Sequence, residues 1–202
     1  MVNKTLISPI RFLLGLICGL LLSACQNAED LIHAARFDDL VKLRECVESG
    51  VCLDHADPAG ETALFHTIGM GSTEAFRLLL EHGANVHHQD FQGNTVLHKA
   101  MTYNQSQMAL ELIKRGLGVN VTNKVGGSAL HYAVRGANHE MVSLLLSQGA
   151  NTRLINSEGN TPLEILKNMY EREGLFDTMG RSISREQIIK TFSALTNTIT
   201  NK

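Results

Sequence analysis

Apolar and polar positions repeat along most of this chain with a period of 33 residues. Leucine recurs at this spacing at Leu64, Leu97, Leu130 and Leu163, four residues after a glycine and two after a threonine or serine. Each period also holds a second apolar stretch at helical spacing, such as the one that predicts a helix over residues 73–81. A fixed period of this length, with two helices in each unit, predicts an array in which neighbouring units share one continuous core.

The residues between the apolar stretches predict how each unit turns. Gly93 closes a polar turn that needs a positive φ, and Thr95 stands where a helix beginning near Val96 needs a capping oxygen. Ala100 would let a neighbouring helix approach closely, and Gly83 would end the preceding helix in a left-handed conformation. Each unit is therefore expected to contain a turn, a first helix, a second helix and a glycine stop.

Several of these segments resemble a known repeat family. Residues 60–65, 93–98, 126–131 and 159–164 match the pattern Gly-x-Thr-Pro-Leu-His, and residues 78–85 and 144–151 match the end of a second helix. In both respects the chain resembles ankyrin repeats. The resemblance implies an all-α ankyrin-repeat solenoid of helix-turn-helix units with short hairpin turns, about five repeats including two caps. It also implies a protein that binds another protein and is not an enzyme.

The register of the period sets the expected boundaries. We expect an N-terminal cap repeat over residues 30–55 and three full repeats over residues 56–88, 89–121 and 122–154. A C-terminal cap repeat with an extra helix is expected over residues 155–195, followed by a tail over residues 196–202. The helix after Pro162 is expected to end near Arg172. The last helix begins with a capping-box pattern at residues 184–187, and its apolar residues Ile188, Ile189, Phe192 and Leu195 are expected to pack on the array. The tail is expected to fray.

Residues 1–24 predict a secretory signal rather than part of the fold. Lys4 and Arg11 supply a positive start, and the apolar run over residues 12–22 is too short for an ordinary membrane-spanning helix. The sequence over residues 22–25 resembles the lipobox of bacterial lipoproteins, which implies cleavage before Cys25, a lipid on its sulfur and an acylated N-terminus. With Gln26 next, the resemblance implies an outer-membrane anchor facing the periplasm. A plain signal peptide with a chance cysteine is the alternative.

A short tether follows from this interpretation. Residues 25–29 would carry the lipidated cysteine and connect it to the repeats, and four extended residues span roughly 14 Å. The folded domain is therefore expected to lie close to the bilayer.

Charge argues against nucleic acid as a partner. The whole chain has a net charge of −2 from 18 basic and 20 acidic residues; removing residues 1–24, which hold Lys4 and Arg11 and no acid, leaves 16 − 20 = −4. No basic stripe remains to contact phosphates. We expect the protein to be monomeric when it is unbound.

The sequence does not predict catalysis, a cofactor or a metal site. It has no G-x-S-x-G motif, no phosphate-binding glycine loop and no His/Cys set with zinc spacing. Two of the nine histidines, His98 and His131, occupy the family's Thr-Pro-Leu-His position, which implies a structural hydrogen bond to the neighbouring turn.

Two cysteines are left after the leader and the lipid anchor. Cys46 has the register of a core position in a second helix, and Cys52 follows just beyond the helix end. In an oxidising periplasm they are predicted to form a disulfide that would stabilise the N-terminal cap. Two free thiols, one of them buried, are the alternative.

The resemblance also places the binding surface at the turn tips and at the exposed face of each first helix. The residues predicted to contact a protein there are Glu61, Met70, Phe91, Gln92, Asn94, Tyr103, Lys124, Tyr132 and Arg135. Aromatic and arginine side chains are enriched in binding hot spots, so four of these, Phe91, Tyr103, Tyr132 and Arg135, are the favoured anchors. The alternative for Phe91 is packing on a neighbouring turn, and for Tyr132 a role within its own repeat.

Three functions are compatible with this sequence. The favoured one is a periplasmic binding or inhibitor protein, including an immunity protein against a secreted toxin such as a phospholipase or a wall hydrolase. The second is an assembly or scaffold factor for an envelope complex, and the third is an enzyme or metal-dependent protein. The first two rest on the compartment and the scaffold, which allow a function without specifying it.

Overall fold

A computed structural model describes residues 28–171 and 179–200, with side chains as far as residue 196. Residues 28–36 form the first helix. The helices that follow are α2 (Leu40–Glu48), α3 (Ala63–Met70), α4 (Thr73–Glu81), α5 (Val96–Thr102), α6 (Ser106–Lys114), α7 (Ala129–Arg135), α8 (His139–Ser147), α9 (Pro162–Tyr170) and α10 (Arg185–Thr200). The helix expected over residues 73–81 is confirmed as α4.

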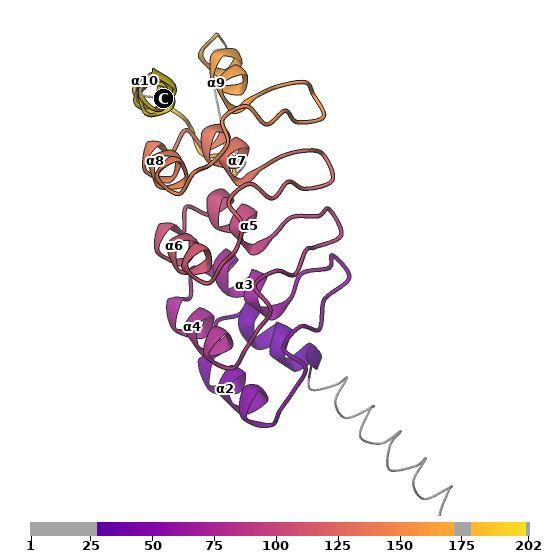
Figure 1. Ribbon diagram of the computed structural model, residues 1–202. Coiled ribbons are helices and arrows are strands. Elements are labelled where there is room, and N and C mark those ends of the chain that lie inside the picture. Colours follow the sequence, from indigo (N-terminus) through magenta and orange to yellow (C-terminus); the bar gives the residue numbers. More distant parts are fainter. Residues whose placement is uncertain (1–27, 172–178, 201–202) are drawn as a thin grey trace, which may run out of the picture.

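The helices stack in two layers (Figure 1). An inner layer of α3, α5, α7 and α9 lies beside the turns, which all project to the same side, and an outer layer of α2, α4, α6, α8 and α10 covers its back. The first helix pairs with α2, so the described chain contains five successive helical pairs. This arrangement confirms the all-α solenoid of about five repeats.

The core runs the length of the stack. One leucine per repeat, at residues 31, 64, 97 and 130, is at most 1% exposed, and the equivalent Leu163 is only half-buried because no further repeat covers it. Each fully buried leucine contributes about 1.5–3 kcal/mol relative to an exposed one. Ala100 is fully buried, as expected for a residue that lets the next inner helix approach.

The turns are linked to one another by backbone hydrogen bonds. The N–H of Phe91 donates to the carbonyl of Ala59 over 3.2 Å, and Lys124 and Ser157 repeat this contact one and two repeats later, at 2.9 and 2.8 Å. A β-carbon added to Gly60 (φ 82°) would lie 2.6 Å from the Phe91 nitrogen. The turn glycine therefore provides both a left-handed conformation and room for the next turn.

The C-terminal cap differs from expectation in the place of its last helix. The helix after Pro162 ends at Tyr170, and α10 is not an extra helix: it packs against α8 and α9 in the outer layer, where the second helix of the fifth repeat belongs. Residues 196–200, the start of the tail that is expected to fray, are included in α10, which extends to Thr200.

A second difference concerns which side of α10 is buried. The predicted capping box is present, since the N–H of Ser184 donates to the Gln187 side chain over 2.7 Å. Ile188 and Leu195 are buried as predicted, but Ile189 is 52% and Phe192 38% exposed. Because α10 is the last element of the stack, only the side facing α8 and α9 is covered.

The N-terminal boundary also shifts. Residues 28 and 29 belong to the first helix, and Ala28 is buried, so the predicted tether shortens to residues 25–27. The predicted signal over residues 1–24 and the lipid site at Cys25 lie outside the described residues. In residues 28–171 and 179–200, no helix combines the length and the apolar character needed to cross a bilayer.

The predicted disulfide is not formed. Cys46 and Cys52 are both free thiols. The inner side of α2 carries Cys46 into the core, where it is 5% exposed, whereas the chain beyond Gly50 leaves Cys52 at the surface. Burial raises the pKa of the Cys46 thiol, which keeps it protonated and unreactive.

Candidate protein-binding groove

Each turn is held by one acidic or amide side chain at its first position. Asp90 Oδ1 accepts hydrogen bonds from the backbone N–H groups of Gln92 and Asn94, both at 2.8 Å. The same pair of contacts is made by Asp57, Asn123 and Asn156 in the other repeats. The turns are therefore internally satisfied and rigid before any partner binds.

Between two of these turns lies a groove of about 440 Å³. The turns containing Ala59 and Phe91 form its walls, and α5 provides its floor. Six of the nine residues predicted to bind a protein line this groove: Glu61, Phe91, Gln92, Asn94, Tyr103 and Tyr132. The fold thus gathers residues that are up to 71 positions apart (132 − 61) on one concave surface.

Phe91 fits both interpretations of its role, because it packs on the neighbouring turn and also stays exposed to a partner. Its ring lies against Gly60, close enough that an added β-carbon there would be 2.9 Å from Cδ1. Yet the side chain is still 65% exposed at the tip of its turn. Packing on the neighbouring turn fixes the ring, and its open face is left for contact with another molecule.

Tyr132, a favoured anchor, and Asn94, a predicted contact residue, both have structural partners within the chain, which favours the alternative role for Tyr132. The Tyr132 hydroxyl donates to Asn94 Oδ1 over 3.2 Å and accepts from Asn123 Nδ2 over 2.8 Å. Asn123 also donates to Asn94 Oδ1 over 2.7 Å, and the Tyr132 ring meets His98 edge to face. These buried and half-buried side chains join two repeats beneath the groove, so only the outer edges of Tyr132 and Asn94 remain for a partner.

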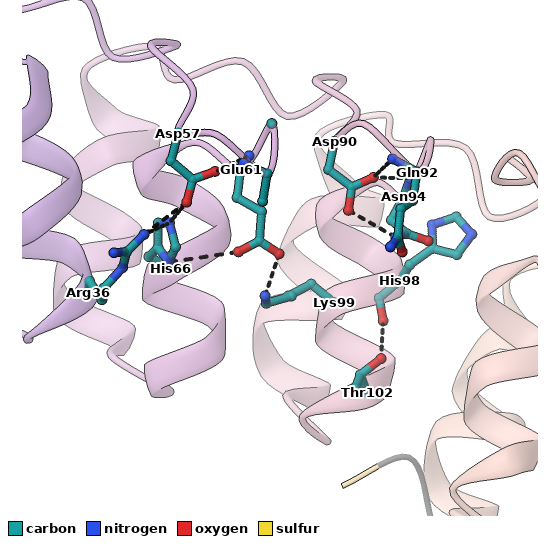
Figure 2. Close-up of polar contacts among 12 residues, drawn as sticks. Arg36, Asp57, Glu61, His66, Asp90, Gln92, Asn94, His98, Lys99 and Thr102 are labelled. Carbon is teal, nitrogen blue, oxygen red and sulfur yellow. Dashed lines mark hydrogen bonds and ion pairs between the residues drawn. The ribbon is translucent and has the colours of Figure 1, made fainter.

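Glu61 and Lys99 form an ion pair at the side of the groove (Figure 2). Lys99 Nζ lies 2.5 Å from Glu61 Oε1, and it also lies 5.3 Å from the centre of the Tyr103 ring. The two charged side chains are 20% and 17% exposed. Glu61 is therefore neutralised within the chain, and Tyr103 contributes mainly its ring to the groove.

The other three predicted residues lie outside the groove. Met70 is 54% exposed at the end of α3, and Lys124 is exposed at the tip of the next turn. Arg135 lies at the end of α7, with one guanidinium nitrogen 3.9 Å from a Glu158 carboxylate oxygen. These positions extend the concave surface on both sides of the groove.

A cluster that sequence reasoning missed lies next to the groove. Asp57 Oδ2 is 2.9 Å from Arg36 Nη2 and 3.1 Å from His66 Nε2, while His66 Nδ1 is 3.8 Å from Glu61 (Figure 2). Asp57, Glu61 and His66 hold three potential metal-ligand atoms within 4.8 Å of one another. However, Arg36 and Lys99 already neutralise the two carboxylates, so this cluster is better suited to linking repeats than to binding a cation.

The ionisation of the cluster follows from its burial and its partners. Partial burial alone would raise the pKa of the Asp57 carboxyl, but backbone N–H groups and His66 donate to it and together lower this pKa below its ordinary value. Burial lowers the pKa of His66, and the neighbouring Arg36 guanidinium lowers it further, against the opposing effects of the Glu61 and Asp57 carboxylates. At neutral pH the aspartate is charged and the histidine is neutral. One signal could have found the cluster: His66 shares its repeat position with Lys99, on the concave side of a first helix.

The structural role predicted for His98 and His131 is confirmed. His98 Nδ1 accepts from the backbone N–H of Thr95 over 3.1 Å, so Nε2 carries the proton and donates to the Gly127 carbonyl over 3.0 Å. His131 makes the same two contacts, with Ser128 and Asn160. Burial lowers the pKa of both histidines, so both stay neutral.

Comparison with known families agrees with the geometry. A family model described as ankyrin repeats, in three copies, matches residues 31–124 and 108–166, which together span more than half of the 202 residues. No curated protein matches the chain. Ankyrin repeats are protein–protein interaction modules, and the groove lies on the side of the stack that faces the turns. This chain belongs to the ankyrin-repeat family.

Proposed function

We propose that this chain is a membrane-anchored periplasmic module that binds another protein through the concave surface around Phe91. We further propose that it acts as an immunity or inhibitor protein, neutralising a secreted toxin such as a phospholipase effector. The observation that carries the binding proposal is the groove between two rigid turns, with Phe91 exposed on its wall and Tyr103 on its floor.

Preorganisation supports this proposal. The groove walls satisfy their own backbone hydrogen bonds, and the turns are joined by the contact from Phe91 to Ala59. A partner would therefore meet a surface whose backbone is already ordered, which lowers the entropy lost on binding.

The sequence supports the proposed anchor. The lipobox-like residues 22–25 would place a lipid on Cys25, and only residues 26 and 27 separate it from the first helix. Three residue steps, from Cys25 to Ala28, span roughly 10 Å. The N-terminal end of the solenoid would therefore lie next to the bilayer. Two or more acyl chains give stable attachment, whereas one gives only weak attachment.

Metabolic labelling with an alkyne fatty acid tests the anchor. The full chain is expected to take up the label and to fractionate with membranes, and the variant Cys25→Ser is expected to do neither. Equal labelling of the two proteins would contradict the lipid site. Secretion of an unlabelled chain would favour the plain signal peptide.

Affinity purification of the full chain from envelope extract tests the binding proposal. The control is the variant Phe91→Ala/Tyr103→Ala/Arg135→Ala, which truncates three exposed or half-exposed side chains and leaves the core intact. One stoichiometric partner that is lost with the control supports the proposed surface, and a partner that the control retains contradicts it. A secreted toxin as partner supports the immunity role, whereas a resident envelope protein supports the assembly alternative.

A further inference from the structure

The four turns use two kinds of residue for one structural task. The first position of the turn is Asp57, Asp90, Asn123 or Asn156, and in every case a single side-chain oxygen accepts two backbone N–H groups. An amide oxygen performs this task in two turns of the same chain. The negative charge of a carboxylate is therefore not needed to form the turn.

Among the described residues, the Asp57 carboxylate has a charged partner in Arg36, whereas the Asp90 carboxylate forms no ion pair. Asp57 lies 2.9 Å from Arg36 and 3.1 Å from His66. Asp90 receives only neutral donors: two backbone N–H groups on Oδ1, and Asn94 Nδ2 on Oδ2 at 2.9 Å (Figure 2). In the part of the chain that the structure describes, no lysine, arginine or histidine nitrogen lies within 4.0 Å of the Asp90 carboxylate.

Asp90 lies in the wall of the groove, and its side chain is only partly buried. The other two charges lining the groove, Glu61 and Lys99, form an ion pair with each other, so the lining keeps a net charge of −1. The same lining contains the aromatic side chains of Phe91, Tyr103 and Tyr132. An unpaired carboxylate beside aromatic rings favours a cation, and a planar guanidinium can both stack on a ring and donate to a carboxylate.

We propose that the groove between the two turns accepts an arginine side chain of the protein partner, with Asp90 as its counter-ion. The inference rests on the proposed binding function and specifies the chemistry of the partner at that surface. The guanidinium would pair with the carboxylate that the fold leaves uncompensated, and its planar face would lie against Phe91 or Tyr103. The Glu61–Lys99 pair stays closed and excludes a second cation from that side.

The chain offers a conservative variant for the test. Asp90→Asn removes the charge and keeps an amide oxygen for the two backbone N–H groups, as Asn123 and Asn156 do in their own turns. Glu140→Gln is the matched control, because it removes one exposed negative charge in the first turn of α8, outside the groove lining.

The probe is the peptide acetyl-Gly-Arg-Gly-amide, and its neutral counterpart carries citrulline in place of arginine. Both are titrated into the isotope-labelled full chain, and binding is followed by the NMR signals of the backbone amides of Phe91, Gln92 and Tyr103. We expect saturable shifts with the arginine peptide, about tenfold weaker binding with the citrulline peptide, and a similar loss in Asp90→Asn. Glu140→Gln is expected to bind like the unaltered chain.

The outcomes separate this inference from the proposed function. Equal binding of the two peptides, shifts outside the groove, or unchanged binding by Asp90→Asn would overturn the arginine site, even if the purification yields a partner. If Asp90→Asn does not fold, the comparison of the two peptides on the unaltered chain decides. If the arginine peptide binds specifically but the purification yields no partner, the arginine site is supported and only the proposed function is contradicted.

Discussion

His98 Nε2 donates to the carbonyl oxygen of Gly127 over 3.0 Å and so connects the first helix of one repeat to the turn of the next. The other ring nitrogen accepts from Thr95 at the start of the same helix. One neutral, buried imidazole thus caps a helix and fixes the spacing between two turns. This contact holds the repeat that carries the Phe91 wall of the groove against the turn that follows it, and the two walls themselves are joined by the hydrogen bond from Phe91 to Ala59.

Replacing this histidine should weaken the whole stack. His98→Leu replaces the imidazole with an apolar side chain of similar size. The Thr95 N–H loses its His98 acceptor, and the Gly127 carbonyl keeps only the Asn123 N–H as a donor, so we expect a loss of about 1–3 kcal/mol in the free energy of unfolding. Urea denaturation followed by circular dichroism measures the change. His87→Leu serves as the control, because the His87 side chain is exposed and forms no hydrogen bond or ion pair within the described part of the chain; equal losses in the two variants would contradict the role of His98.

Stability should fall on mild acidification. Burial lowers the pKa of His66, His98 and His131 in the folded chain, so the unfolded chain binds protons first as the pH drops through about 6.5. The stability that each neutral histidine contributes is therefore fully present above about pH 6.5 and is lost as the pH falls toward the lower pKa of the folded state. For each histidine, the free energy of unfolding falls by at most about 1.4 kcal/mol per pH unit.

The measurement is the free energy of unfolding between pH 7.5 and 5.5. We expect it to decrease over this range, and we expect the slope to be smaller in His98→Leu, which lacks one of the three groups. A free energy that is constant or rises on acidification would show that these histidines are not held neutral by the fold.

The turn glycines allow a matched pair of substitutions. Gly60 and Gly159 have similar positive φ values of 82° and 78°, but an added β-carbon at Gly60 would lie 2.6 Å from the Phe91 nitrogen, whereas at Gly159 nothing lies within 4 Å. Gly159→Ala should therefore cost only the left-handed strain, about 1 kcal/mol, and Gly60→Ala about 2–4 kcal/mol. Thermal unfolding compares the two, and equal melting temperatures would contradict the close approach of successive turns.

The two cysteines should differ in their reactivity. Iodoacetamide is expected to modify the exposed Cys52 of the native chain rapidly, and to modify Cys46 only when the chain unfolds, because burial shields that thiol and raises its pKa. Peptide mapping by mass spectrometry locates the label, and Cys52→Ser is the control for site assignment. If both cysteines resist labelling until a reductant is added, they form a disulfide, which would contradict the two free thiols.

Local pattern predicted the repeating parts of the molecule well. The helix α4, the cap at Thr95 and the hydrogen bonds of His98 follow from residue types at fixed positions within one unit, and all are present. These features depend on contacts with the same or the adjacent repeat, which a regular period places reliably.

The parts that the sequence did not predict depend on the ends of the stack or on contacts specific to one repeat. The apolar side of α10 is wider than the surface available to cover it, so periodicity alone could not show that Ile189 and Phe192 stay exposed. The linkage of Arg36, Asp57 and His66 arises because three different repeat positions meet on the concave side. Comparing residue types at one position across the repeats would have marked His66, which shares its position with Lys99 and Tyr132, as a residue worth examining.

Site-specific photo-cross-linking tests the central claim most directly. A photoreactive amino acid replaces Gln92, which is exposed on the groove wall, or Ser143, which is exposed on the outer helix α8. In intact cells that carry the partner, we expect one specific adduct from position 92 and none from position 143. An adduct from position 143 alone would contradict binding through the concave surface, and no adduct from either position in the presence of the partner would contradict the proposed protein-binding role of this face.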